Sequence, residues 1–168
     1  MFWACRLSRT CHVDRSARFI GLRAWDDSSV LLLPGPEDLT SLVLRVDFGD
    51  EVRWEACQET LSGSGDDRMA TFVSDIGFDG VTTQRLVELD TGADLDDRVF
   101  YLFVADSTTL GDDEFPLLAV DLDGEPGRTF RVPVAFFADV SANLSIGNMD
   151  FAEFADAVDA TGAYRGFN

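Results

Sequence analysis

Lysine is absent from this chain of 168 residues, and histidine occurs once, as His12. A lysine nucleophile, a Schiff-base lysine and the lysine of a phosphate-binding P-loop are therefore excluded. Beyond residue 12 there is no imidazole for a Ser-His-Asp or Cys-His relay, a histidine general base or a histidine-based metal site. These absences exclude most acid–base enzymes.

Other signals are also missing. The three cysteines show no paired framework, which is typical of a reducing compartment. No stretch approaches the ~20 apolar residues of a membrane span, and arginines interrupt every early apolar stretch that could be a secretory signal. No glycine pattern after a predicted strand matches the dinucleotide-binding fingerprint. We expect a cytoplasmic protein that does not bind a membrane.

Negative charge dominates what is present, because 31 acidic residues stand against 13 arginines for a net charge of −18. Residues 1–25 hold five arginines and one aspartate, so residues 26–168 carry a net charge of −22. Such a chain is a poor candidate for nucleic-acid binding, which needs clustered cations. We expect residues 1–35 to be either a basic, disordered leader or a mis-assigned start, and residues 36–168 to be one acidic domain.

The first half of that domain alternates strand and helix patterns. Apolar, β-branched runs predict strands at 42–48, 70–76 and 99–105. Asp50 is a favourable N-cap for a helix that ends before Gly63, and Thr82 caps a shorter helix. Two strand–helix–strand units predict parallel pairing, and the continuous apolarity of the strands predicts helices on both faces.

The second half changes pattern. Strands at 117–122 and 128–132 flank a turn-rich link and predict a hairpin. A helix is expected from Pro133, and a final helix from Phe151 to a stop at Gly162. The predicted fold is α/β: a single domain with a mixed β-sheet of about five strands, in the order β-α-β-α-β, then a β-hairpin and two C-terminal helices, with helices packed on the sheet.

Carboxylates end two of the expected parallel strands. Asp47 and Asp106 follow the first and third strands, and Asp50 is close to Asp47. Ligands favour the carboxyl ends of such strands, and clustered carboxylates suit Mg²⁺. The alternative is that Asp50 caps a helix and Asp106 organises a turn. Polar neighbours of this candidate metal site are Ser107, Thr108 and Thr109.

A polar loop lies between the last two expected helices. It contains Asn143, Ser145 and Asn148. These side chains are expected to cap the final helix. The alternative is that the loop, which also carries Ile146 and Met149, presents a partner surface.

Several stretches resemble a family of small actinobacterial single-domain proteins of unknown function. They are 42–48, 54–56, 103–110, 126–132 and 143–154, and the Asn-Leu-Ser-Ile-x-Asn-Met-Asp-Phe run at 143–151 is the most specific. The resemblance covers about residues 40–168. It implies a bacterial cytosolic setting and a stand-alone domain, and it implies no activity.

Two functional hypotheses follow. The first is a non-catalytic acidic interaction module, similar to inhibitor or immunity proteins, that covers a basic protein partner. The second is a phosphoryl-handling enzyme that uses Mg²⁺ at Asp47, Asp50 and Asp106, the one cofactor that these residues suggest. A third reading is that the acidity serves solvation alone.

Overall fold

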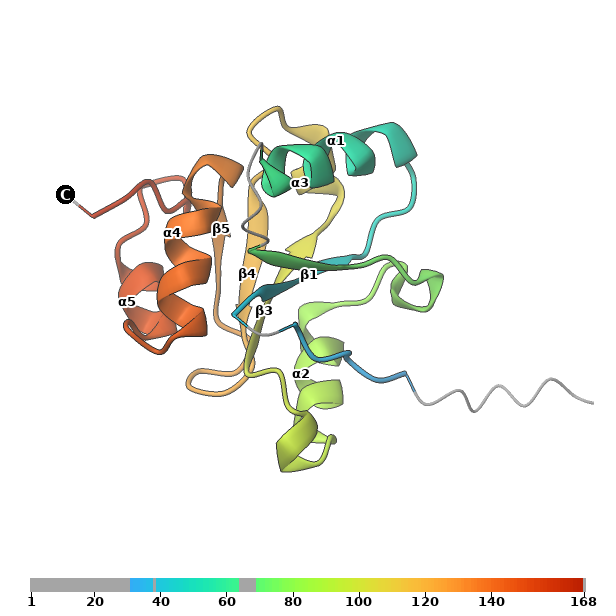
Figure 1. Cartoon of the computed structure of the whole chain (residues 1–168), viewed down its shortest axis with the longest axis vertical. Coiled ribbons are helices and arrows are strands. Elements are labelled where there is room, and N and C mark those ends of the chain that lie inside the picture. The colour runs from blue at the N-terminus through green and yellow to red at the C-terminus, as the bar shows by residue number, and fades with distance from the viewer. Residues whose placement is uncertain (1–30, 38, 64–68, 168) are drawn as a thin grey trace, which may run out of the picture. The chain divides into compact units, whose positions relative to one another are not determined.

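Within residues 31–37, 39–63 and 69–167, which the computed structural model describes, five apolar segments form one mixed β-sheet (Figure 1). The strands lie in the order β2-β1-β3-β4-β5. β1 pairs in parallel with β2 and β3, whereas β4 is antiparallel to β3 and β5. The strands are β1 (Ser41–Arg45), β2 (Ala70–Val73), β3 (Tyr101–Ala105), β4 (Leu117–Asp121) and β5 (Thr129–Val132).

Helices connect or follow these strands. In the described part of the chain they are α1 (Glu51–Ser62), α2 (Thr83–Thr91), α3 (Ser107–Gly111), α4 (Val134–Ser145) and α5 (Phe151–Asp156), with 3-10 turns η1 (Ile76–Phe78) and η2 (Leu95–Asp97). None of these helices has both the length and the apolarity that crossing a bilayer requires. The predicted single-domain α/β fold is confirmed, and α3 is an addition between β3 and β4.

Alternating strand residues enter two cores, one on each face of the sheet. In β1, Val43 packs with residues of α1, α4 and α5, whereas Leu42 and Leu44 pack with residues of α2. In β3, Phe103 belongs to the same core as Val43, and Leu102 to the same core as Leu42 and Leu44. Side chains of a strand point to opposite faces in turn, so a strand that is apolar throughout needs cover on both. Figure 1 shows α2 on the side of the sheet away from α1.

The predicted ends of α1 and the start of α2 are confirmed. Asp50 Oδ1 accepts the Arg53 N–H at 3.0 Å, and Thr82 Oγ1 accepts the Arg85 N–H at 3.3 Å. Gly63 follows α1 with φ +59°, a conformation that glycine adopts without a Cβ clash. Local hydrogen-bonding chemistry therefore sets these boundaries.

The predicted end of the last helix is wrong, because α5 ends at Asp156 and not before Gly162. The apolar periodicity continues, but Asp159 Oδ1 accepts the backbone N–H of Thr161 at 2.7 Å. A short polar side chain that bonds the backbone nearby competes with helical hydrogen bonds. The chain turns there and runs on beside β5.

Most of the expected basic leader, residues 1–30, lies outside the described residues. The remaining residues of the leader, 31–35, include Leu31 and Leu33. Both side chains pack against the core on the α2 face.

Candidate functional site

The carboxyl ends of β1 and β3 lie side by side, as the sequence predicts. Arg45 pairs with Ala105 in the parallel register, so Asp47 and Asp106 both follow this edge of the sheet. Asp47 Oδ1 accepts the Gly49 N–H at 2.7 Å, in a tight turn before α1. Because Asp50 caps α1, these two carboxylates each bond to the backbone beside them.

Asp106 has a different partner. Its two oxygens accept both terminal nitrogens of Arg131 in a bidentate pair, at 3.0 and 2.8 Å. Oδ1 also accepts the Thr109 N–H at 2.9 Å, so Asp106 is the N-cap of α3. Burial by itself raises the pKa of Asp106, but the hydrogen bonds from Arg131 and Thr109 and the charge of Arg131 outweigh it and lower the pKa.

The residues with hydroxyl groups next to Asp106 differ in their exposure. Thr109 is buried, and its hydroxyl donates to the Pro116 carbonyl at 3.0 Å. Ser107 and Thr108 are exposed in the first turn of α3. Among the residues described, no group of three or more His, Cys, Asp or Glu side chains is placed to hold a metal ion. A Mg²⁺ ion shared by Asp47, Asp50 and Asp106 stays a prediction.

Sequence reasoning missed a buried arginine at this edge. Arg45 is 1% exposed, and it donates from Nη1 to Glu51 Oε2 at 2.6 Å and from Nε to the Asp47 carbonyl at 2.8 Å. Its guanidinium carbon lies 4.4 Å from the centroid of the Phe48 ring, while Nη2 has no hydrogen-bond partner among the described residues. The signal in the sequence is an arginine inside an apolar run. A cation that is buried there needs hydrogen-bond acceptors and aromatic rings as partners.

The polar segment with Asn143, Ser145 and Asn148 spans the last turn of α4 and the loop after it, and its side chains bond within the segment. Asn143 and Ser145 lie in the last turn of α4, where Asn143 Nδ2 donates to the Asp139 carbonyl at 2.8 Å. Asn148 Nδ2 donates to Asn143 Oδ1 at 2.7 Å. The expectation that these side chains cap the final helix is wrong, because Asp150 caps α5 in a capping box.

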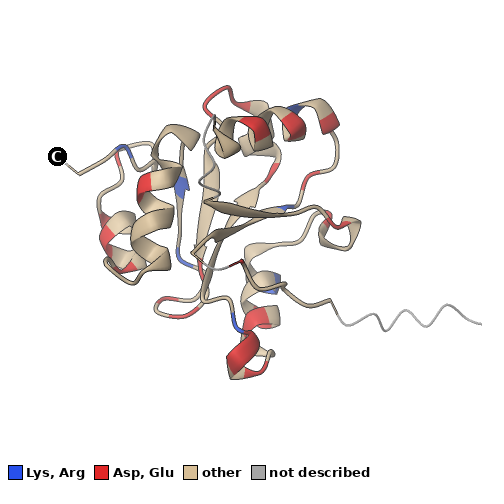
Figure 2. Ribbon diagram, viewed as in Figure 1, with Lys and Arg blue, Asp and Glu red and all other residues tan. Residues whose placement is uncertain are grey.

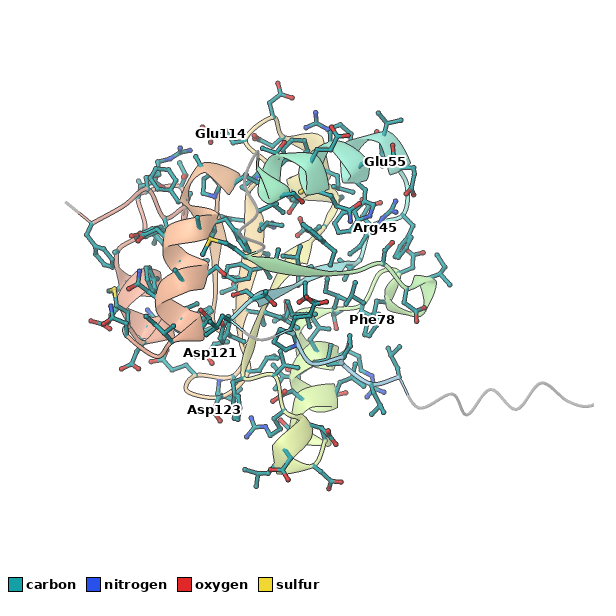
Figure 3. The ribbon with its side chains drawn as sticks, viewed as in Figure 1. Arg45, Glu55, Phe78, Glu114, Asp121 and Asp123 are labelled. Carbon is teal, nitrogen blue, oxygen red and sulfur yellow. The ribbon has the colours of Figure 1, made fainter. Side chains whose placement is uncertain are left out.

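This loop forms one wall of a groove of about 620 Å³, which the β4–β5 turn and the start of β3 complete. Among the described residues, four carboxylates and no arginine line it; the carboxylates belong to Asp121, Asp123, Glu125 and Asp150. The aromatic and long apolar side chains of the lining are those of Phe100, Tyr101, Leu144, Met149 and Phe151. The groove therefore joins an acidic rim to an apolar wall. Figure 3 shows Asp121 and Asp123 at the β4–β5 turn, near the lower end of α4.

The carboxylates of the β4–β5 turn differ in what they can offer a ligand. Asp121 is 4% exposed and accepts the backbone N–H groups of Asp123, Gly124 and Glu125 at 2.9, 3.1 and 2.8 Å, so it holds the turn. Asp123 and Glu125 are exposed. These two side chains are the ones that a ligand reaches.

Phe100 holds a backbone conformation that bulky residues avoid. Its φ is +64°, and the Tyr101 N–H donates to the Val99 carbonyl at 2.8 Å across it, which is the hydrogen bond of a γ-turn. Such strain costs of order 1–3 kcal/mol and is concentrated at functional sites. The Phe100 side chain is 44% exposed at the groove.

A buried ion pair holds the residues before Phe100. Asp90, whose side chain is fully buried in α2, accepts the Val99 N–H at 2.6 Å and Arg98 Nε at 2.8 Å. Arg98 also reaches Asp123 at 3.3 Å, and its guanidinium carbon lies 5.2 Å from the centroid of the Phe100 ring. Asp90 thus connects α2 to the rim and to the aromatic wall of the groove.

One sequence signal points to Asp90, although nothing in the sequence points to the φ of Phe100. Asp90 lies in the last turn of α2, where the helix dipole disfavours a carboxylate. An acidic residue at that place needs a partner, and Arg98 is eight residues further along the chain.

Comparison with known protein families gave a match for most of the chain. No curated protein matches the chain. The family model described as a domain of unknown function, DUF6924, matches residues 40–167. The chain belongs to that family.

Proposed function

We propose that this protein is a non-catalytic acidic binding module that takes a basic segment of a partner protein into the groove between the β4–β5 turn and the α4–α5 loop. The observation that carries the proposal is the lining, with four carboxylates beside an apolar wall. The volume of about 620 Å³ suits a few side chains of a partner.

Charge complementarity supports a cationic occupant. The chain carries a net charge of −18, and Figure 2 shows acidic residues at the β4–β5 turn as well as on α1 and near the end of α2. A surface of this sign attracts a basic partner and speeds the encounter, and it repels nucleic acid. Exposed carboxylates accept more than one hydrogen bond, so Asp123 and Glu125 can bond a partner's cation beside their own arginines.

The apolar wall supplies the part of the binding energy that charge at a rim does not. Exposed ion pairs contribute about 0–1 kcal/mol each, whereas an anchor side chain buried in a pocket contributes more. The half-exposed Phe100 ring and Met149 flank the rim. We expect the preferred segment to combine arginine with a large apolar residue.

The test uses a short fluorescein-labelled peptide of Arg-Leu-Gly repeats, whose glycines disfavour a strand, and fluorescence anisotropy at low and high salt. The variant pair Asp123→Asn and Glu125→Gln is expected to weaken binding about fivefold and to flatten the salt dependence. The matched control is the pair Asp79→Asn and Asp97→Asn, which removes equal charge from exposed residues outside the groove. Equal losses in the two pairs contradict the proposal, and so does a peptide that does not bind.

A further inference from the structure

The two edge strands of the sheet, β5 and β2, differ in their hydrogen-bond partners. Beside β5 the returning chain forms two hydrogen bonds, from the Arg131 N–H to the Gly162 carbonyl at 2.9 Å and from the Tyr164 N–H to the Arg131 carbonyl at 2.8 Å. At the other end, β2 pairs with β1 on its inner side. The Glu37 N–H donates to the Thr71 hydroxyl at 2.9 Å, but no backbone group of the described residues bonds to the main chain of β2 on its outer side. β2 is thus the end of the sheet where a strand can be added.

The outward groups of β2 follow from its register. The Met69 carbonyl accepts the Ser41 N–H at 3.0 Å, so Met69 points inward to β1. Inward and outward groups alternate along a strand. Ala70 and Phe72 therefore direct their N–H and carbonyl groups to the outer edge.

β2 is short, but it carries neither the charged residues nor the proline that protect many edge strands. Its sequence is Ala-Thr-Phe-Val, with no charge and no proline, and all four residues are only partly buried. Natural edge strands avoid pairing by means of lysine, proline, inward charges or bulges. An edge without them suits β-augmentation, in which an extended segment adds main-chain hydrogen bonds.

An acidic groove runs beside this edge. It measures about 690 Å³, and Glu55, Glu59 and Phe72 are among its lining residues. The two glutamates are exposed and one helical turn apart on α1, and the Phe72 ring packs edge-on against Trp54 with centroids 6.0 Å apart. In Figure 1, α1 runs along β2, the green strand below it, and Figure 3 labels Glu55 on α1.

We infer that the outer edge of β2 takes an extended basic segment of a partner protein as a sixth strand, with cationic side chains at alternate positions against Glu55 and Glu59. The spacing fits, because residues i and i+2 of a strand are about 6.6 Å apart and residues i and i+4 of a helix are about 6 Å apart along its axis. This surface is separate from the groove at Phe100, so the inference does not depend on the proposed function.

Charge also argues against a second copy of this chain as the occupant. A copy that pairs through its own β2 brings no cation on residues 70–73 and places its Glu55 and Glu59 near the same acidic row. Like charges that meet across an interface oppose association. The edge therefore suits a cationic segment, which we take to come from another protein.

The test uses the full chain and a labelled peptide of alternating Val and Arg, with a peptide of the same composition in two blocks as its control. We expect the alternating peptide to bind about tenfold more tightly, because it alone sets every arginine on one face of a strand. Amide hydrogen exchange, followed by NMR, should slow at Ala70 and Phe72 when the alternating peptide binds.

Two variants separate the main chain from the charge. Ala70→Pro removes an outward N–H at the first residue of an edge strand, a place that accepts proline, and is expected to weaken binding about tenfold. The pair Glu55→Gln and Glu59→Gln is expected to weaken binding about fivefold and to reduce its salt dependence. The pair Asp79→Asn and Asp97→Asn serves again as the charge control and should leave binding unchanged.

Equal affinity for the two peptides overturns the inference, as does unchanged exchange at Ala70 and Phe72. Dimerisation of the free protein that Ala70→Pro abolishes also overturns it, because the edge then binds a copy. The groove pair Asp123→Asn and Glu125→Gln should leave binding of the alternating peptide unchanged. That result separates a failure at β2 from a failure of the proposed function. If Ala70→Pro does not fold, the glutamate pair and the exchange measurement still decide.

Discussion

Removal of the Asp90 carboxylate is expected to be one of the costliest single changes in the described core. In Asp90→Ala, the Val99 N–H loses its acceptor at 2.6 Å and Arg98 loses the shorter of its two ion pairs, at 2.8 Å. The Asp90 side chain is fully buried, so water does not replace the carboxylate. The residues before the strained Phe100 are released at the same time.

The size of the effect follows from these contacts. A hydrogen bond to a charged group contributes about 1.5–3 kcal/mol, and the breaking of a buried pair costs about 3–5 kcal/mol. Arg98 keeps its pair with Asp123 at 3.3 Å, which places the loss near the lower end, at about 3 kcal/mol. Against a total of about 5–15 kcal/mol for a domain, the Tm should fall by roughly 10 °C.

Urea unfolding of Asp90→Ala and Asp123→Ala measures this prediction. Both carboxylates pair with the same guanidinium, but Asp123 is 56% exposed. The Asp123 variant should therefore lose no more than about 1 kcal/mol. Equal losses in the two variants, or a loss below about 1 kcal/mol for Asp90→Ala, would refute the reasoning that burial sets the strength of this pair.

Three further predictions concern titration and metal binding. Because the pKa of Asp106 is lowered in the folded state, the stabilisation by its carboxylate is present above its ordinary pKa of 3.8 and is lost as the pH falls through the folded value. In Asp106→Asn, the free energy of unfolding, measured with urea, should therefore fall less at acid pH. Burial and the hydrogen bond to Asp139 raise the pKa of Tyr164 to about 12, so the stabilisation by this phenol is lost as the pH rises toward 12. An ultraviolet titration, with Tyr164→Phe to identify the signal of Tyr164, should show that it ionises late. Ionisation of Tyr164 near pH 10 counts against the packing. If Asp47, Asp50 and Asp106 share Mg²⁺, calorimetry on the wild type gives a saturable heat that Asp106→Ala loses, and no heat in the wild type contradicts the site.

Local patterns in the sequence predicted the elements of the fold well. Asp50, Gly63 and Thr82 act through hydrogen bonds and φ values within a few residues, so their roles could be predicted without the tertiary structure. The last helix was predicted too long, because the Asp159 side chain competes with the helix and the returning chain pairs with β5. The short helix α3 was missed, since five residues make too few turns for a periodic signal.

The candidate sites were harder to predict. The neighbouring places of Asp47 and Asp106 were predicted correctly from strand order, but the salt bridge of Asp106 with Arg131 spans 25 residues and leaves no local trace. The candidate interaction loop was proposed from its residues alone. The groove that it borders needs the β4–β5 turn and Phe100, which only the folded chain brings together.

The sequence by itself determined the lack of lysine and of histidine beyond residue 12, the acidic charge and the α/β order of elements. Composition and periodicity are properties of the chain alone. The tertiary structure decided which carboxylates pair with arginines and which are exposed, since contacts between distant residues depend on how the sheet and helices pack. It also decided that Phe100 holds a strained turn at a groove and that β2 ends the sheet beside an acidic row. These features arise from packing across the domain, and no local pattern encodes them.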